Sequence, residues 1–126
     1  MKIFISIMML IGGIFAQCGQ SGFRSLSANE FEQAIKSSNI VVLDSRTARE
    51  YSDGHIRNAV NIDVNGSDFE RKALATLSKS KTIAVYCRSG RRSKKAAEIL
   101  SNNGYNVIEL DCGILCWASS GKEIVK

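Results

Sequence analysis

The feature that most constrains the fold is a regular alternation of short apolar runs with amphipathic stretches. The apolar runs, rich in Val and Ile, lie at residues 39–46, 82–87 and 106–110. Their length and composition are typical of strands that are buried on both faces of a parallel sheet. Helical patterns separate the runs, and such alternation favours right-handed crossovers. The sequence therefore predicts an α/β fold with a mostly parallel central sheet covered by helices on both sides.

The starts and one stop of the helices can be read from short polar motifs. A capping box pairs Ser or Thr with Glu three residues later, and the two side chains satisfy free backbone amides at the helix start. Such pairs stand at the start of three helical patterns, Ser27 with Glu30, Thr47 with Glu50 and Ser67 with Glu70. The pattern of residues 91–105 contains Gly104, which we expect to end that helix.

Length and charge set broad limits. A chain of 126 residues with 44% hydrophobic content has material for one compact domain. Its 17 Lys and Arg against 12 Asp and Glu give a net charge of +5. This excess fits a small anionic substrate, a margin of solubility or weak attraction to polyanions. The charge alone does not choose between them.

The N-terminal segment has the pattern of an export signal. Residues 1–16 place Lys2 before an apolar run that is short for a membrane span. We expect a signal peptide here and a periplasmic or secreted mature protein. The alternative is a lipoprotein signal of residues 1–17 before a lipidated Cys18, although Gln17 fits that pattern badly. Membrane attachment is expected only in that second case.

Cys87 stands at a strand end, before an arginine-rich loop and a helix. Ligands of open α/β sheets bind beyond the carboxyl ends of the strands. There the amides of residues 88–92 and the positive end of the helix dipole favour an anion, and they favour a thiolate over a thiol. Simple packing of Cys87 as a small apolar residue would not explain Gly90 and three arginines. No Walker-type phosphate motif is present in the sequence.

Three segments resemble signatures of one family. The segments are VVLDSRTAREYSDGHIRNAVNID, VYCRSGRRSKKAAEIL and DCGILCWASSG, at residues 41–63, 85–100 and 111–121. In this order they are similar to the rhodanese-like domains. The resemblance places a rhodanese-like domain at residues 23–126, behind the signal peptide. It implies a three-layer α/β fold with about five strands in a mostly parallel sheet.

The resemblance also implies a site. Cys87 would be the catalytic nucleophile, and the loop that follows would bind the substrate through Arg88, Ser89, Gly90, Arg91, Arg92 and Ser93. Rhodanese-like phosphatases and arsenate reductases carry an arginine six residues after the cysteine, where this chain has Ser93. The shorter loop resembles that of the sulfurtransferases, so phosphatase or arsenate reductase activity is less expected.

The expected function is therefore that of an exported thiosulfate sulfurtransferase. Cys87 would take a sulfane sulfur from a small anionic donor such as thiosulfate, hold it as a persulfide and pass it to cyanide or to a thiol, including a protein thiol. No metal, organic cofactor or nucleic acid is expected to take part. The alternative is a non-catalytic sulfur carrier or thiol redox partner that uses the same cysteine.

Several other residues favour structural interpretations. We expect Asp44 and Arg46 to form a buried ion pair, Trp117 to anchor the core, and Lys94 and Lys95 to lie on a solvated helix face. His55 stands at the expected start of a strand, within a family signature that is structural, so we do not expect it to act as a base.

Cys112 departs from the resemblance, because it stands where the first glycine of a Gly-Gly pair is expected. In an oxidising compartment it could bridge to Cys116, but only through an irregular turn, since a regular helix would hold the two too far apart. The other possibilities are two thiols packed beside Trp117, or a Cys112 thiol that resolves the Cys87 persulfide.

Overall fold

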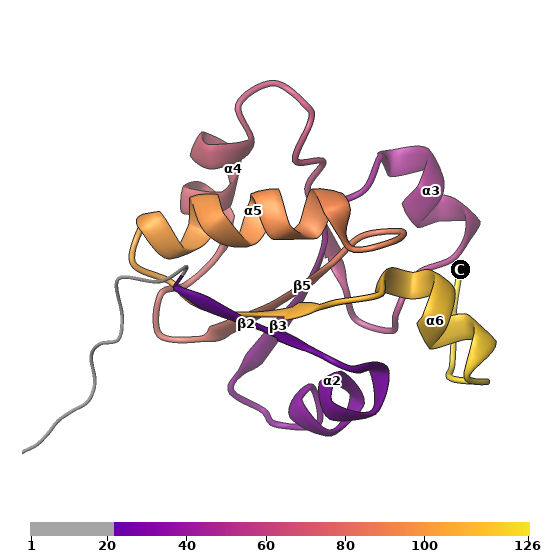
Figure 1. Cartoon of the computed structure of the whole chain (residues 1–126). Helices are drawn as coiled ribbons and strands as arrows, with labels where there is room; N and C mark the ends of the chain where they lie inside the picture. The colour runs from indigo at the N-terminus through magenta and orange to yellow at the C-terminus, as the bar shows by residue number, and fades with distance from the viewer. Residues whose placement is uncertain (1–21) are drawn as a thin grey trace, which may run out of the picture.

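The computed structural model describes residues 22–126 and shows a five-stranded sheet between two layers of helices (Figure 1). The predicted signal peptide and Cys18 lie outside the described residues. The strand order is β2-β6-β5-β3-β4, and every neighbouring pair is parallel. The strands are β2 (Phe23–Leu26), β3 (Ile40–Asp44), β4 (Val60–Asn61), β5 (Thr82–Tyr86) and β6 (Asn106–Leu110). The predicted three-layer α/β fold is confirmed.

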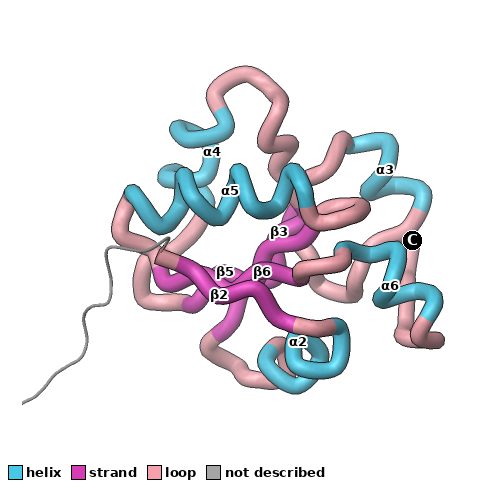
Figure 2. The backbone as a smooth tube through the Cα atoms, viewed as in Figure 1, coloured by secondary structure: helices cyan, strands magenta, loops and turns pink. Residues whose placement is uncertain are grey.

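Helices cover both faces of this sheet (Figure 2). They are α2 (Ala28–Ala34), α3 (Ala48–Asp53), α4 (Phe69–Thr76), α5 (Arg91–Asn102) and α6 (Gly113–Ser119). One core cluster joins α4 and α5 to the sheet, and a second joins α2 and α6 to its other face. Alternate residues of each strand serve the two clusters, as Val85 and Tyr86 of β5 do. None of the described helices is long and apolar enough to span a bilayer.

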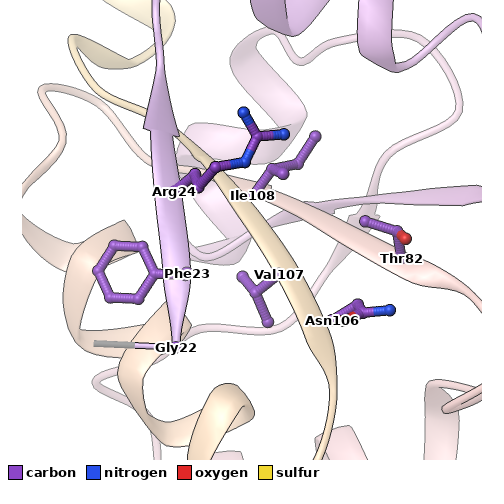
Figure 3. A pocket seen from close by; sticks show the side chains of 7 residues that line it. All are labelled: Gly22, Phe23, Arg24, Thr82, Asn106, Val107 and Ile108. Carbon is purple, nitrogen blue, oxygen red and sulfur yellow. The ribbon is translucent and has the colours of Figure 1, made fainter. Parts of the chain in front are cut away.

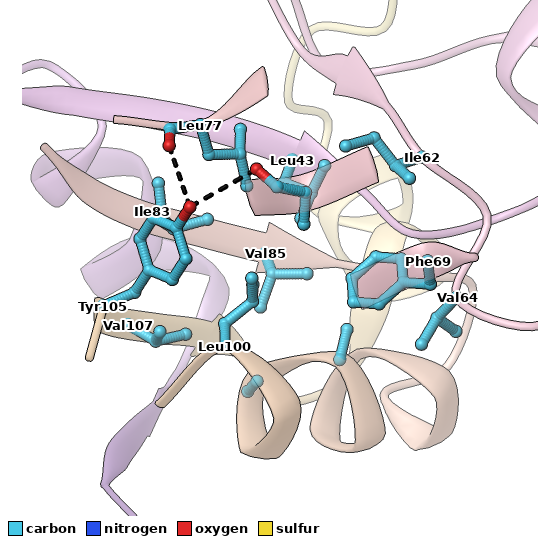
Figure 4. Packing of buried hydrophobic residues seen from close by; sticks show 13 residues of the cluster. Leu43, Ile62, Val64, Phe69, Leu77, Ile83, Val85, Leu100, Tyr105 and Val107 are labelled. Atoms are coloured by element: carbon cyan, nitrogen blue, oxygen red, sulfur yellow. Dashed lines mark hydrogen bonds between the residues drawn. The ribbon is translucent and has the colours of Figure 1, made fainter. Parts of the chain in front are cut away.

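The cluster under α4 and α5 is tightly filled (Figure 4). Leu43, Ile83 and Val85 of the sheet and Ala97 of α5 are all 0% exposed and belong to this cluster. The Tyr105 hydroxyl is the polar group at its edge, and it donates to the Leu77 carbonyl at 2.8 Å. On the other face Trp117 is 3% exposed and meets Phe31 edge to face, so the predicted core anchor is confirmed.

Two of the three predicted capping boxes are present. Ser27 and Thr47 accept the expected backbone amides and receive the reciprocal contacts from Glu30 and Glu50. The third is wrong, because Asp68, with φ of 63°, is the residue before the first helical turn of α4. Glu70 then comes second in the helix instead of third, out of reach of the box geometry.

The predicted end of helix α5 at Gly104 is confirmed, and residues 55–64, which follow α3, are mostly without regular structure. Gly104 has φ of 90°, just beyond the end of α5, as expected for a glycine that terminates a helix. Residues 55–64 form a strand only at Val60–Asn61. Strand β2 was not predicted, because its four residues contain two exposed polar side chains and no apolar run.

The core makes a direct test of stability possible. Leu43→Ala should lower the free energy of unfolding by about 2–5 kcal/mol, because it opens a cavity in a fully packed cluster. Leu74→Ala is the matched control, since Leu74 is 44% exposed on α4, and its effect should stay within about 0.5 kcal/mol. Urea denaturation followed by circular dichroism measures both. Equal losses would contradict this description of the core.

Candidate active site

Cys87 follows the last residue of β5 and lies at the carboxyl edge of the sheet. It is 1% exposed, and the Gly90 amide donates to its Sγ at 3.1 Å. Gly90 has φ of 104°, a left-handed conformation that turns the loop back over the sulfur before α5 begins at Arg91. Among residues 22–126, Cys87 is the free cysteine. The predicted strand, loop and helix arrangement is therefore present, with a backbone amide directed at the sulfur.

The loop is fixed by direct backbone contact with the segment after β6. The Ile114 and Leu115 amides donate to the carbonyls of Cys87 and Arg88, at 2.9 and 3.2 Å. A Cβ at Gly90 would overlap the Asp111 carbonyl, and a Cβ at Gly113 would overlap the Arg88 carbonyl. Both positions therefore need glycine, because a side chain at either one would overlap the backbone of the other segment. These contacts join the loop after β5 to the start of α6.

A disulfide joins Cys112 and Cys116 beside this contact. Their Cα atoms are 5.7 Å apart, and the irregular turn that a bridge requires is supplied by Gly113, with φ of 72°. Of the three possibilities for this pair, the structure shows the bridge. A Cys112 that is bonded to Cys116 has no thiol with which to resolve a persulfide, so that role would first need reduction of the bridge.

The loop residues divide into two groups. Arg88, Ser89 and Arg91 are exposed to solvent, where a substrate could meet them. Arg92 instead forms a two-pronged ion pair with Glu50 of α3, with nitrogen to oxygen distances of 2.7 and 2.9 Å. The hydrogen bonds from Arg92 are the largest of the contacts that lower the pKa of Glu50 to about 2. The charge of Arg92 is therefore already matched within the protein.

Ser93, expected to bind the substrate, is fully buried behind the sulfur. Its Oγ lies 3.4 Å from Cys87 Sγ and donates to Glu109 Oε2 at 2.5 Å. The Lys94 side chain is 42% exposed and Lys95 is exposed, as expected of a solvated helix face. Lys94 Nζ also contacts Glu109 at 3.3 Å and Asp111 at 2.8 Å, two ion pairs that the sequence does not predict because they depend on how α5 packs against β6.

The predicted ion pair of Asp44 and Arg46 is present and buried, with Nη2 to Oδ2 at 2.6 Å. Tyr86 adds its hydroxyl to the same carboxylate at 2.8 Å. Burial, together with the charge of Asp44, raises the pKa of Tyr86, so this hydroxyl stays protonated as a donor. His55 stacks on Tyr51 with ring centroids 3.7 Å apart, and its backbone pairs with Val125.

Two hollows show where a ligand could approach. One of about 270 Å³ is lined by Arg88 of the loop and by residues of α3, α6 and their flanks, namely Arg46, Glu50, Asp53, Gly54, Ile114 and Leu115. The other, of about 360 Å³, is lined by Gly22, Phe23, Arg24, Thr82, Asn106, Val107 and Ile108 (Figure 3). It lies at the amino ends of β2, β5 and β6, the edge of the sheet opposite Cys87. Of these two hollows, the first therefore lies at the edge of the sheet that carries Cys87, beside Arg88 of the loop.

A family model described as the rhodanese-like domain matches residues 27–120. The chain belongs to this family. The family accounts for the arrangement of Cys87 and its loop, and the match lies within the predicted domain span.

Individual relatives carry different names. An Escherichia coli K12 protein named thiosulfate sulfurtransferase PspE is 40% identical over 67 residues, which are 53% of this chain and 64% of that protein. A tRNA uridine(34) hydroxylase of the Aster yellows witches'-broom phytoplasma is 35% identical over 96 residues, 73% of this chain but only 31% of that protein. A crystal structure of a rhodanese-related protein from Thermoplasma volcanium has a TM-score of 0.71 and 34% identity, and covers 81% of this chain and 97% of that one.

The ion pair of Glu50 and Arg92 predicts a specific acid dependence. The pKa of Glu50 is about 2 in the folded chain against an ordinary value of 4.5, so the pair stabilises the fold fully above pH 4.5. This stabilisation should disappear as the pH falls through about 2. The difference in unfolding free energy between wild type and Glu50→Gln, followed by urea denaturation against pH, should show that loss.

Glu30→Gln is the control for this prediction. Glu30 has the same place in a capping box, but its pKa is lowered chiefly by Ser27, and the charge of Arg24 contributes less than those hydrogen bonds. Subtracting the Glu30 profile from the Glu50 profile isolates the ion pair with Arg92. Two superimposable profiles would mean that the pair adds nothing to stability.

Proposed function

We propose that this chain is a sulfurtransferase that carries a sulfane sulfur on Cys87. The observation that carries the proposal is the free Cys87 sulfur at the carboxyl edge of a parallel sheet, with the Gly90 amide donating to it at 3.1 Å. Membership of the rhodanese-like family and the likeness to a thiosulfate sulfurtransferase support it. The donor is a small anion such as thiosulfate, and the acceptor is cyanide or a thiol, including a protein thiol.

The reaction follows from nucleophilic catalysis in two half-reactions. The Cys87 thiolate attacks the outer sulfur of thiosulfate, the S–S bond of the donor breaks, and sulfite leaves with the bonding electron pair. Cys87 then carries a persulfide, whose negative charge the Gly90 amide helps to hold. A thiolate or cyanide attacks the terminal sulfur and restores the Cys87 thiolate. Arg88 and Arg91 are exposed beside the loop and attract the donor's oxygens.

The same geometry disfavours phosphatase or arsenate reductase chemistry. Those reactions need a guanidinium to clamp a tetrahedral oxyanion. The position six residues after Cys87 holds the buried hydroxyl of Ser93, and Arg92 is already paired with Glu50. The reaction named for the phytoplasma relative is that of a protein of which this chain matches only 31%, and we do not extend it to this chain.

We also propose that the protein acts after export. The apolar run of residues 1–16 supports a signal peptide, with attachment to a membrane only if Cys18 is lipidated. The disulfide of Cys112 and Cys116 adds support, because such bridges persist in oxidising compartments.

Cys87→Ser should abolish sulfur transfer while it leaves the fold intact, because a neutral hydroxyl does not form a persulfide. With thiosulfate and cyanide, wild type should release sulfite over many turnovers. A single stoichiometric burst from wild type would instead indicate a sulfur carrier. Turnover by the Cys87→Ser variant would reject the site.

Removing the exposed arginines should weaken donor binding. Arg88→Ala together with Arg91→Ala should raise the KM for thiosulfate severalfold and reduce its dependence on salt, since exposed charges are screened over about 10 Å at 0.1 M salt. Lys95→Ala, which removes an exposed charge from the same helix, is the control. An unchanged KM in the double variant would remove these arginines from substrate binding.

A further inference from the structure

A line of buried polar groups leads from Cys87 into the protein. The sulfur lies 3.4 Å from the Ser93 hydroxyl, which donates to Glu109 Oε2 at 2.5 Å. Ser93 and Glu109 are both 0% exposed. The other oxygen of Glu109 accepts the hydroxyl of Ser25 in the neighbouring strand β2 at 2.6 Å. A buried carboxylate thus lies one hydroxyl away from the thiol.

The direction of these hydrogen bonds decides what they can do. A serine hydroxyl has one proton to donate. Ser93 donates that proton to Glu109, so the Ser93 oxygen can only accept a hydrogen bond from Cys87. This hydrogen bond stabilises the protonated thiol, which is the unreactive form of Cys87. If the Cys87 proton moves to Ser93 and the Ser93 proton moves to Glu109, Ser93 instead donates to the thiolate and stabilises the reactive form.

We propose that Glu109 is the base that deprotonates Cys87, with Ser93 passing the proton. The Cys87 S–H proton moves to Ser93 Oγ while the Ser93 proton moves to Glu109 Oε2. The S–H bond leaves its electron pair on sulfur, Ser93 remains neutral, and Glu109 becomes a neutral acid. The thiolate then accepts from the Ser93 hydroxyl and from the Gly90 amide. This proposal rests on the proposed function, because it explains how the Cys87 thiolate, the nucleophile of sulfur transfer, is formed.

The surroundings of Glu109 suit a change of protonation. The groups that face its carboxylate are Ser25 from β2 and Ser93 and Lys94 from α5. Lys94 Nζ is 3.3 Å from Glu109 and 2.8 Å from Asp111. When Glu109 takes the proton, Lys94 therefore keeps a carboxylate partner, and no unpaired charge is left in the interior.

The chain offers a matched pair of variants. Ser25→Ala and Ser93→Ala each remove one hydroxyl from the same carboxylate, but only Ser93 also contacts the sulfur. The Cys87 thiolate is measured by its ultraviolet absorbance against pH, with the Cys87→Ser protein as reference for all other groups. Ser93→Ala should lower the thiolate fraction at neutral pH about tenfold, because the thiolate loses both the Ser93 hydroxyl that donates to it and the link to Glu109. Ser25→Ala should not lower it, because Ser25 does not contact the sulfur and its loss does not weaken Glu109 as a base.

Glu109→Gln tests the base itself by the sign of its effect. Loss of the base should lower the thiolate fraction. A carboxylate that acted only through its charge would repel the thiolate, so the same substitution would then raise that fraction and overturn the proposal. Equal titrations of Ser25→Ala and Ser93→Ala would also overturn it.

If Glu109→Gln does not fold, as circular dichroism would show, the pair of serine variants still decides. The titration needs no sulfur donor. Failure of wild type to form a persulfide with thiosulfate would therefore reject the proposed function separately.

Discussion

The contact on which the site depends is the packing of two backbone segments without side chains between them. Gly90 lies against the Asp111 carbonyl and Gly113 lies against the Arg88 carbonyl, so the loop after β5 and the turn after β6 form one unit. Amides of Ile114 and Leu115 complete it by binding the carbonyls of Cys87 and Arg88. Because those carbonyls are bound on one side, the Gly90 amide can point at the sulfur on the other.

Several of the positive charges around this unit are paired with carboxylates, which the local sequence does not show. The segment CRSGRRSK carries four cations, but Arg92 is matched by Glu50, and Lys94 by Glu109 and Asp111. Only Arg88 and Arg91 present their charge to solvent beside the thiol. The field that attracts a donor anion is therefore smaller and more local than a count of arginines implies. The paired cations instead tie α5 to α3 and to β6.

The sequence predicts the elements that depend on local patterns and misses those that depend on distant partners. Strands β3, β5 and β6, the helix that starts at Arg91 and the ion pair of Asp44 with Arg46 follow from apolar runs, caps and family signatures. Strand β2 has no such pattern, since it is held by pairing with β6, which follows it by some eighty residues. The start of α4 differs from the prediction because Asp68, in a left-handed conformation that the Ser-x-x-Glu pattern does not reveal, precedes the first turn of the helix.

Glu109 illustrates the same limit at the site. The run NVIEL predicts a strand buried on both faces, and a carboxylate inside such a run is costly unless other groups satisfy it. The acidic residue within an apolar run therefore indicates a carboxylate that needs buried partners. The sequence does not identify those partners, Ser25, Ser93 and Lys94, because they come from two other elements. Along β6, Val107 and Glu109 face the α5 side, where Val107 joins the core and Glu109 meets Ser93. The alternation that builds a strand thus also places an acid behind the thiol, and only the register of β2 and α5 against β6 gives that acid its partners.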